Sequence, residues 1–135
     1  MSGPTIRSHR DLIVWQKAME LVVDVYRESD SFPKTEIYGL TSQLRRAIVS
    51  VPANIAEGQG RRLVGEYIQF LGNARGSLLE VDTHLEIAQR LGFLTTANHF
   101  RLAEELAEVR RLLNGLMRSL EKPRIPPIRH LTSDI

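Results

Sequence analysis

The 135-residue chain has no cysteine, a single tryptophan, only three lysines and no long apolar run. The lack of cysteine excludes disulfides, iron–sulfur clusters and zinc sites built on thiolates. No stretch approaches the roughly 18 apolar residues that a membrane-spanning helix needs, and residues 1–11 lack the apolar segment of a secretory signal. We therefore expect one soluble, cytoplasmic domain without a membrane partner.

Arginine, in contrast, is abundant, because 15 of the 18 basic residues are Arg and 16 acidic residues leave a formal charge of +2. The charge is uneven: residues 11–40 carry three basic and six acidic groups, whereas residues 41–75 carry five and two. The basic residues of the second band are Arg45, Arg46, Arg61, Arg62 and Arg75. They either contact phosphates of RNA or DNA, or are solvated and paired with Glu57, Glu66 and Glu80.

Apolar residues recur at spacings of three and four in four segments, residues 12–26, 40–55, 67–88 and 102–120, and no segment alternates as a strand does. Residues that end or start helices separate them, namely Pro33, Gly58, Gly60, Gly92, Thr95, Thr96 and Pro123. The pattern predicts an all-α fold, an antiparallel up-down-up-down four-helix bundle over residues 1–122. Residues 123–135 are expected to form an extended tail with prolines, either a basic arm or a packed or frayed end.

Two features point to a homo-oligomer. The first helix carries two apolar stripes, more than one bundle core needs, so it either sits deeply in the bundle or has a second partner, expected to be another copy of the chain. Gly65, Gly72 and Gly76 share one side of the third helix. Since glycine costs about 1 kcal/mol in a helix interior, they indicate close approach of another backbone, with drift as the alternative.

Pro52 lies inside the helical pattern of the second segment, where it removes a hydrogen bond and is expected to bend the helix. One interpretation is structural: the bend curves the bundle, and Asn54 and Glu57 form a buried polar network. The other is functional: the bend and its polar residues shape a ligand site. We favour the structural interpretation.

Residues that would support catalysis are few. The four histidines are far apart, and none lies at a spacing that converges on a metal. The chain has no phosphate-binding loop, and the glycines at 58 and 60 lack the strand-and-helix setting of a nucleotide fingerprint. We therefore predict a protein that is not an enzyme and has no cofactor and no metal site.

Several closely spaced motifs point to a known family. The first is Asp11-Leu12-x-x-Trp15-Gln16-x-Ala18, and the second joins Phe32-Pro33 to Glu36-x-Tyr38-Gly39-Leu40-x-x-Gln43-Leu44-Arg45-Arg46-Ala47. Ser50-x-Pro52-x-Asn54-Ile55-Ala56-Glu57-Gly58, Glu66-Tyr67-x-x-Phe70-Leu71 and Ala74-Arg75-Gly76-Ser77-x-x-Glu80 follow. Over about residues 9–95 the chain resembles the small bacterial four-helix proteins encoded within intervening sequences of 23S ribosomal RNA genes.

The resemblance implies an antiparallel four-helix bundle that assembles as a barrel-like homopentamer. The related accessory variability determinant of diversity-generating retroelements is similar in fold, binds nucleic acid through a basic surface and partners a reverse transcriptase. By this resemblance, a reverse transcriptase is a candidate partner.

Two hypotheses of function follow. In the first, the oligomer binds structured nucleic acid, RNA before DNA, without catalysis through Arg45, Arg46, Arg61, Arg62 and Arg75. In the second, the chain is a scaffold or adaptor that binds a protein, and these arginines only solvate the surface.

Overall fold

The computed structural model describes residues 5–121, and these residues contain four α-helices and no strand. The helices are α1 (Ile13–Ser29), α2 (Leu40–Gln59), α3 (Val64–Arg90) and α4 (Thr96–Glu121). Short 3-10 helices, His9–Asp11 and Lys34–Glu36, precede α1 and α2. The prediction of an all-α chain with four helices is confirmed, whereas the expected tail at 123–135 lies outside the described residues.

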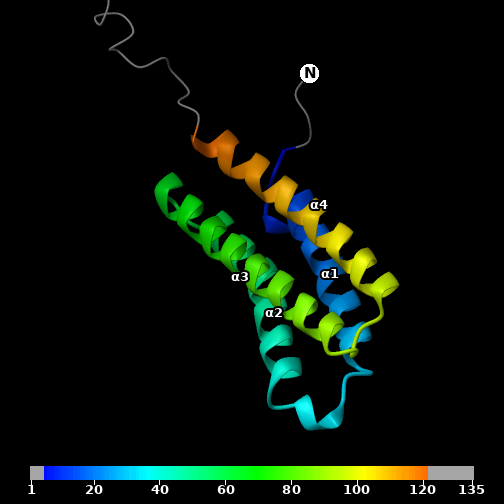
Figure 1. Cartoon of the computed structure of the whole chain (residues 1–135). Helices are drawn as coiled ribbons and strands as arrows, with labels where there is room; N and C mark the ends of the chain where they lie inside the picture. Colours follow the sequence, from blue (N-terminus) through cyan, green and yellow to red (C-terminus); the bar gives the residue numbers. More distant parts are fainter. Residues whose placement is uncertain (1–4, 122–135) are drawn as a thin grey trace, which may run out of the picture.

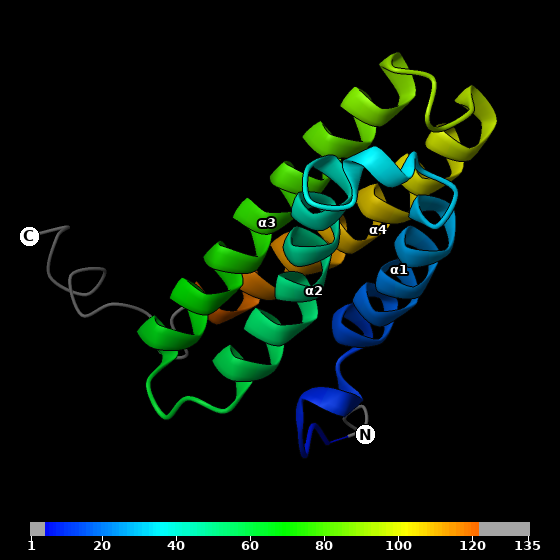
Figure 2. The same ribbon diagram turned by 90° about the horizontal axis from the view of Figure 1, so that it is seen from below.

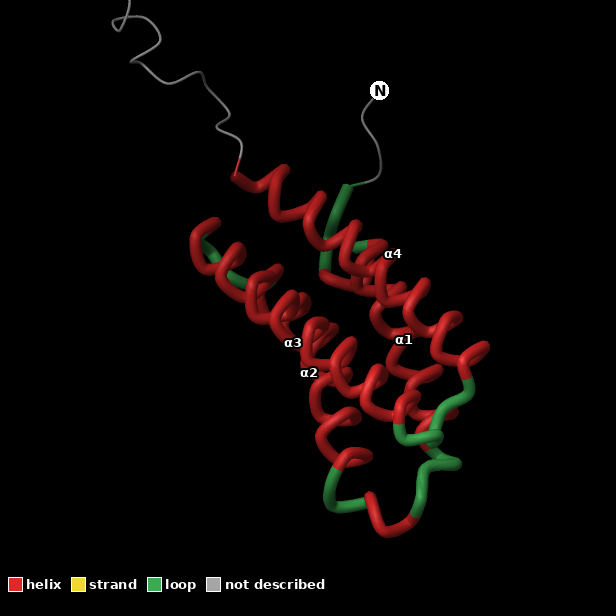
Figure 3. The backbone as a smooth tube through the Cα atoms, viewed as in Figure 1, coloured by secondary structure: helices red, strands yellow, loops and turns green. Residues whose placement is uncertain are grey.

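The four helices lie side by side in a bundle (Figures 1 and 2). Both α1 and α3 pack against α2 and α4, while in the described part the backbones of the diagonal pairs, α1–α3 and α2–α4, do not approach each other. The α2–α3 connection lies at the same end of the bundle as residues 5 and 121, and the other two connections lie at the opposite end (Figure 3). No described helix is both long and apolar enough to cross a membrane.

The helix ends follow the local signals in the sequence. α1 ends at Ser29, four residues before Pro33, which disfavours helical geometry at Phe32 and so prevents the helix from continuing past this segment. Gly92 follows α3 with a φ of +80°, a conformation that glycine adopts without strain. At the start of α4, Oγ1 of Thr95 accepts a hydrogen bond of 3.1 Å from the backbone N–H of Asn98. Of the two predicted helix starts, Thr95 and Thr96, it is therefore Thr95 that caps this helix.

The core follows the apolar stripes. On α3, Tyr67 begins the predicted repeat of four and three and is half-buried, and the six residues that continue it are buried: Leu71, Ala74, Leu78, Val81, Leu85 and Ala88. On α1, one stripe is fully inside the bundle (Val14, Ala18, Leu21 and Val25). The other stripe stays partly exposed: Met19 is 39% exposed, and with Trp15 and Val22 it lines an apolar groove of about 290 Å³ against Val49, Pro52, Ala53 and Ala56 of α2.

The surroundings of Pro52 contradict one part of the structural interpretation. Glu57 is exposed and pairs with Arg61 one turn away, while Asn54 is half-buried and donates to the carbonyl of Ser50 at 2.8 Å. The predicted buried network of Asn54 and Glu57 is therefore wrong, because each residue finds a partner within its own helical turn. Pro52 itself is buried and lines the apolar groove.

The α2–α3 pair is packed more closely than the other helix pairs. Oγ of Ser50 donates to Oγ of Ser77 across this contact at 2.6 Å. A Cβ placed on Gly58 would lie 2.9 Å from Cβ of Phe70, so only glycine fits there without a shift. In contrast, nothing lies within 4 Å of a Cβ placed on Gly65, Gly72 or Gly76. Within the described chain, the glycine at which two helices approach closely is therefore Gly58. That the three glycines of α3 contact another copy of the chain stays a prediction.

Candidate nucleic-acid interface

The five predicted arginines lie in three places. Arg45 and Arg46 are in the first half of α2, Arg61 and Arg62 are in the connection to α3, and Arg75 is in the middle of α3. Sixteen residues separate Arg45 from Arg61, about 24 Å along a helix of 1.5 Å rise per residue. One molecule therefore does not gather all five into one patch.

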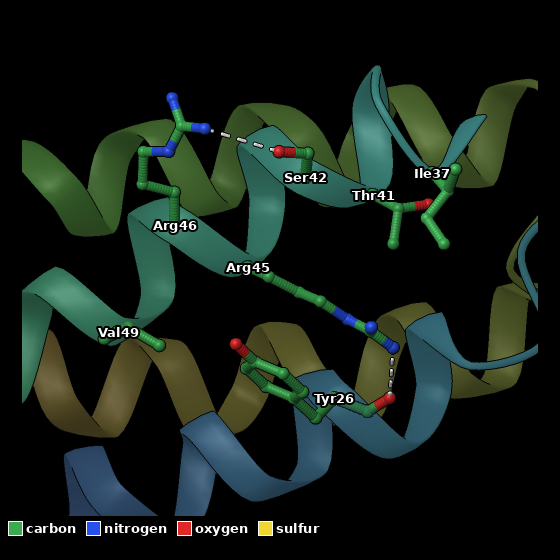
Figure 4. Close-up of a pocket in the computed structure, with 7 residues that line it drawn as sticks. All are labelled: Tyr26, Ile37, Thr41, Ser42, Arg45, Arg46 and Val49. Atoms are coloured by element: carbon green, nitrogen blue, oxygen red, sulfur yellow. Dashed lines mark hydrogen bonds between the residues drawn. The ribbon is translucent and has the colours of Figure 1, made fainter.

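Arg45 is held against the end of α1 (Figure 4). Its Nε donates to Oγ of Ser29 at 2.9 Å, and its Nη2 donates to the backbone carbonyl of Tyr26 at 3.2 Å. The guanidinium carbon also lies 4.6 Å from the centre of the Tyr26 ring. The carbonyl end of a helix carries partial negative charge, so a cation is stabilised there. Arg45 thus joins α2 to the end of α1.

Arg46 points away from this contact (Figure 4). Its side chain is exposed, and its only described hydrogen bond is a long one of 3.5 Å from Nη2 to Oγ of Ser42. Between them, Arg45 and Arg46 border a shallow hollow of about 390 Å³ whose wall includes Tyr26 and Ile37. Arg46 is therefore more available to a ligand than Arg45.

The loop pair differs in the same way. Arg61 pairs with Glu57, with Nη2 2.9 Å from Oε2, and its guanidinium carbon lies 4.6 Å from the centre of the Phe70 ring. Arg62 is exposed. Arg75, also exposed, donates from Nη1 to Oδ1 of Asn114 on α4 at 3.3 Å. Among the described residues, no carboxylate oxygen lies within 4.0 Å of the guanidinium nitrogens of Arg46, Arg62 or Arg75.

Three further arginines carry no role predicted from the sequence. Arg110, Arg111 and Arg118 of α4 are exposed, and in residues 5–121 none has a carboxylate oxygen within 4.0 Å. They lie within one turn of Asn114, the partner of Arg75. Their spacing in the sequence was a usable signal, because residues three and four apart share a helix face. What the sequence did not show was which face of α4 meets Arg75.

Other arginines are neutralised locally. Arg90 pairs with Glu86 at 2.8 Å, and this hydrogen bond lowers the pKa of Glu86. Arg27 has an oxygen of Asp24 at 3.8 Å, and Arg101 contacts both Glu28 and Glu105. These residues lie toward the end of the bundle opposite residues 5 and 121, so that end carries compensated charge (Figure 1).

The comparisons with known proteins agree with this architecture. A family model described as 23S rRNA-intervening sequence protein matches residues 10–115. The chain belongs to this family. The chain is also similar to a crystal structure of a protein with unknown function from the S23 ribosomal protein family, from Bacteroides thetaiotaomicron VPI-5482. The TM-score is 0.71 at 21% identity, with 78% of this chain and 98% of that chain covered, and shows a shared fold. No curated protein matches the chain.

Proposed function

We propose that this member of the family is a non-catalytic accessory protein of the cytoplasm that binds structured nucleic acid, RNA in preference to DNA. In this proposal it acts as a homo-oligomer, a pentamer, of antiparallel up-down-up-down bundles. The observation that carries the proposal is the exposure of Arg46, Arg62 and Arg75 with no carboxylate within 4.0 Å in the described part. Such arginines bind phosphates without first breaking an ion pair. The link of the family name to 23S rRNA intervening sequences favours RNA.

The arginines do not contribute equally to this function. Arg46, Arg62 and Arg75 contact phosphates, whereas Arg45 mainly fixes α1 to α2 and Arg61 shares its charge with Glu57. An oligomer multiplies the three available arginines and brings together patches that one molecule keeps apart. Because phosphate contacts release counterions, binding is expected to weaken steeply with salt.

Fluorescence anisotropy tests the proposal with a labelled RNA stem-loop, duplex DNA and single strands between 50 and 300 mM salt. We expect tightest binding to the stem-loop and a linear fall of log K against log salt, whose slope reports the number of phosphate contacts. The variant Arg46→Ala/Arg62→Ala is expected to reduce the slope by about two. No binding at 50 mM salt would contradict the proposal.

The second candidate function is a scaffold that binds a protein, for which a reverse transcriptase is the candidate partner. The apolar groove lined by Trp15, Met19 and Pro52 favours it, since an open apolar surface is typical of a contact with another chain. The two functions differ in one readout. Under the scaffold function, Met19→Glu abolishes binding of the protein partner. Under the first function, RNA affinity per folded oligomer falls for the arginine variants and not for Met19→Glu.

A further inference from the structure

The α3–α4 face carries four exposed arginines without a carboxylate partner in the described chain. Asn114 lies at its centre, and Arg75 reaches it from α3 with an Nη1–Oδ1 distance of 3.3 Å. Arg110 and Arg118 stand one turn before and one turn after Asn114, and Arg111 stands between Arg110 and Asn114. We call this group, Arg75, Arg110, Arg111 and Arg118, the α3–α4 arginine row.

The row is regular because of helix geometry. Residues four apart on a helix have Cβ atoms about 5–6 Å apart and face the same side. Arg110, Asn114 and Arg118 therefore form a line along α4, and the contact with Asn114 directs Arg75 toward that line. A line of planar cations with several donors each fits a chain of phosphates, where each guanidinium takes one phosphate.

The acidic residues near the row leave its charge in place. Glu121 lies three residues after Arg118 on α4, and Asp82 lies two turns after Arg75 on α3. Neither carboxylate is within 4.0 Å of an arginine of the row. Of the other acidic residues on α4, Glu105 contacts Arg101 and Glu108 contacts Lys17, and the exposed Glu104, seven residues before Arg111, has no oxygen within 4.0 Å of it. The face therefore keeps four positive charges.

The surface chemistry around the row favours a nucleic acid over a protein partner. Protein interfaces depend on central aromatic or large aliphatic anchors. Beside the row stands one such residue, Leu79, which is 54% exposed one turn after Arg75 on α3; on the described part of α4 the exposed large apolar residue is Phe100, ten residues before Arg110. The neighbours of the row on α4 are small, Ala107 and Gly115. Phosphate contacts need no apolar anchor, because they position the ligand by charge and hydrogen bonds.

We propose that the α3–α4 arginine row is a binding site for the phosphate backbone of nucleic acid, with Asn114 as the residue that positions Arg75. The proposal rests on the proposed function, because it assigns one surface to the nucleic-acid binding proposed there. It also adds Arg110, Arg111 and Arg118 to the arginines that the sequence pattern predicted.

The test compares two double variants in the same RNA stem-loop titration between 50 and 300 mM salt. Arg110→Ala/Arg118→Ala removes two arginines of the row, and Arg27→Ala/Arg90→Ala removes two arginines that already face carboxylates. Each changes the formal charge from +2 to 0, because two positive charges are lost. We expect the row variant to lower affinity at least tenfold and the salt slope by about two, with the control near wild type.

The outcomes separate this inference from the proposed function. Binding by wild type with equal slopes for the two variants overturns the row and leaves the proposed function standing. No binding by wild type overturns both. A labelled polyaspartate peptide of equal charge serves as the second probe: binding as tight as that of RNA would show a general acidic-ligand site and overturn the assignment to nucleic acid. Unchanged thermal unfolding of both variants confirms that they fold.

Discussion

The guanidinium of Arg45 lies 4.6 Å from the centre of the Tyr26 ring and donates to the backbone carbonyl of the same residue at 3.2 Å. One side chain of α2 thus uses both a ring face and a helix-end carbonyl of α1. Ser29, buried beside them, accepts from Nε of Arg45 and itself donates to the Tyr26 carbonyl at 3.2 Å. The contact fixes the end of α1 on α2, and it makes Arg45 different in kind from its neighbour Arg46.

The first prediction follows from this contact. Arg45→Ala loses one cation–π contact and two hydrogen bonds, and it leaves the buried Ser29 hydroxyl with one partner fewer. We expect the free energy of unfolding to fall by about 2 kcal/mol. Urea unfolding measures it, and Arg46→Ala is the matched control because that side chain is exposed. Equal stability of the two variants would show that the contact with α1 contributes nothing.

The second prediction concerns Gly58 at the α2–α3 contact. A Cβ there would lie 2.9 Å from Cβ of Phe70 and 3.1 Å from the carbonyl oxygen of Tyr67, so the helices must separate. We expect Gly58→Ala to destabilise the fold by about 1–3 kcal/mol, despite the better helix propensity of alanine. Thermal unfolding compares it with Gly60→Ala, whose added Cβ meets its nearest neighbour at 3.6 Å. A variant as stable as wild type would contradict the close packing.

Much of the fold could be predicted from local patterns. The apolar residues of α3 recur at spacings of four and three, and the helical periodicity of about 3.6 residues per turn places them on one side. This pattern therefore predicts the buried face of α3. The Thr95 cap and the Gly92 end depend on neighbours within a few residues, so they too are visible in the sequence. The direction of the four helices and the assembly are properties of distant contacts and stay predictions.

The candidate site was harder to predict because its residues are separated in sequence. Arg45 meets Ser29 sixteen residues away, and Arg75 meets Asn114 thirty-nine residues away. Residue type alone made both arginines equal candidates for phosphate binding. The wrong prediction of a buried network between Asn54 and Glu57 has a local cause instead. Arg61, four residues after Glu57, offers it an ion pair at the surface, and this pair competes with a buried network.

The third prediction is a pH dependence at the α1–α4 contact. Burial and the neighbouring carboxylate of Asp24 raise the pKa of Glu105 from 4.5 to about 7, and Arg101 opposes this only in part. Between these two pKa values the folded state holds a proton that the unfolded state has lost. Stability therefore falls as pH rises from about 4.5 to above 7.

Thermal unfolding from pH 4.5 to 8.5 tests this dependence. Glu105→Gln keeps the size of the side chain but does not ionise, so we expect it to gain stability over wild type as pH rises, with the largest difference above pH 7. The exposed Glu104→Gln is the control. A constant difference between Glu105→Gln and wild type across this range would show that Glu105 titrates normally.

The fourth prediction tests how Asn114 acts on Arg75. Asn114→Asp keeps the shape of the side chain but gives Arg75 a carboxylate, so an ion pair replaces a neutral hydrogen bond and removes one available charge from the row. We expect RNA affinity to fall and the salt slope to drop by more than one, because the new negative charge also repels phosphate. Asn114→Ala frees Arg75 without adding charge, and its slope should stay near wild type while affinity falls less. If Asn114→Asp binds RNA as wild type does, the phosphate path does not cross this part of α4, whatever the other arginines contribute.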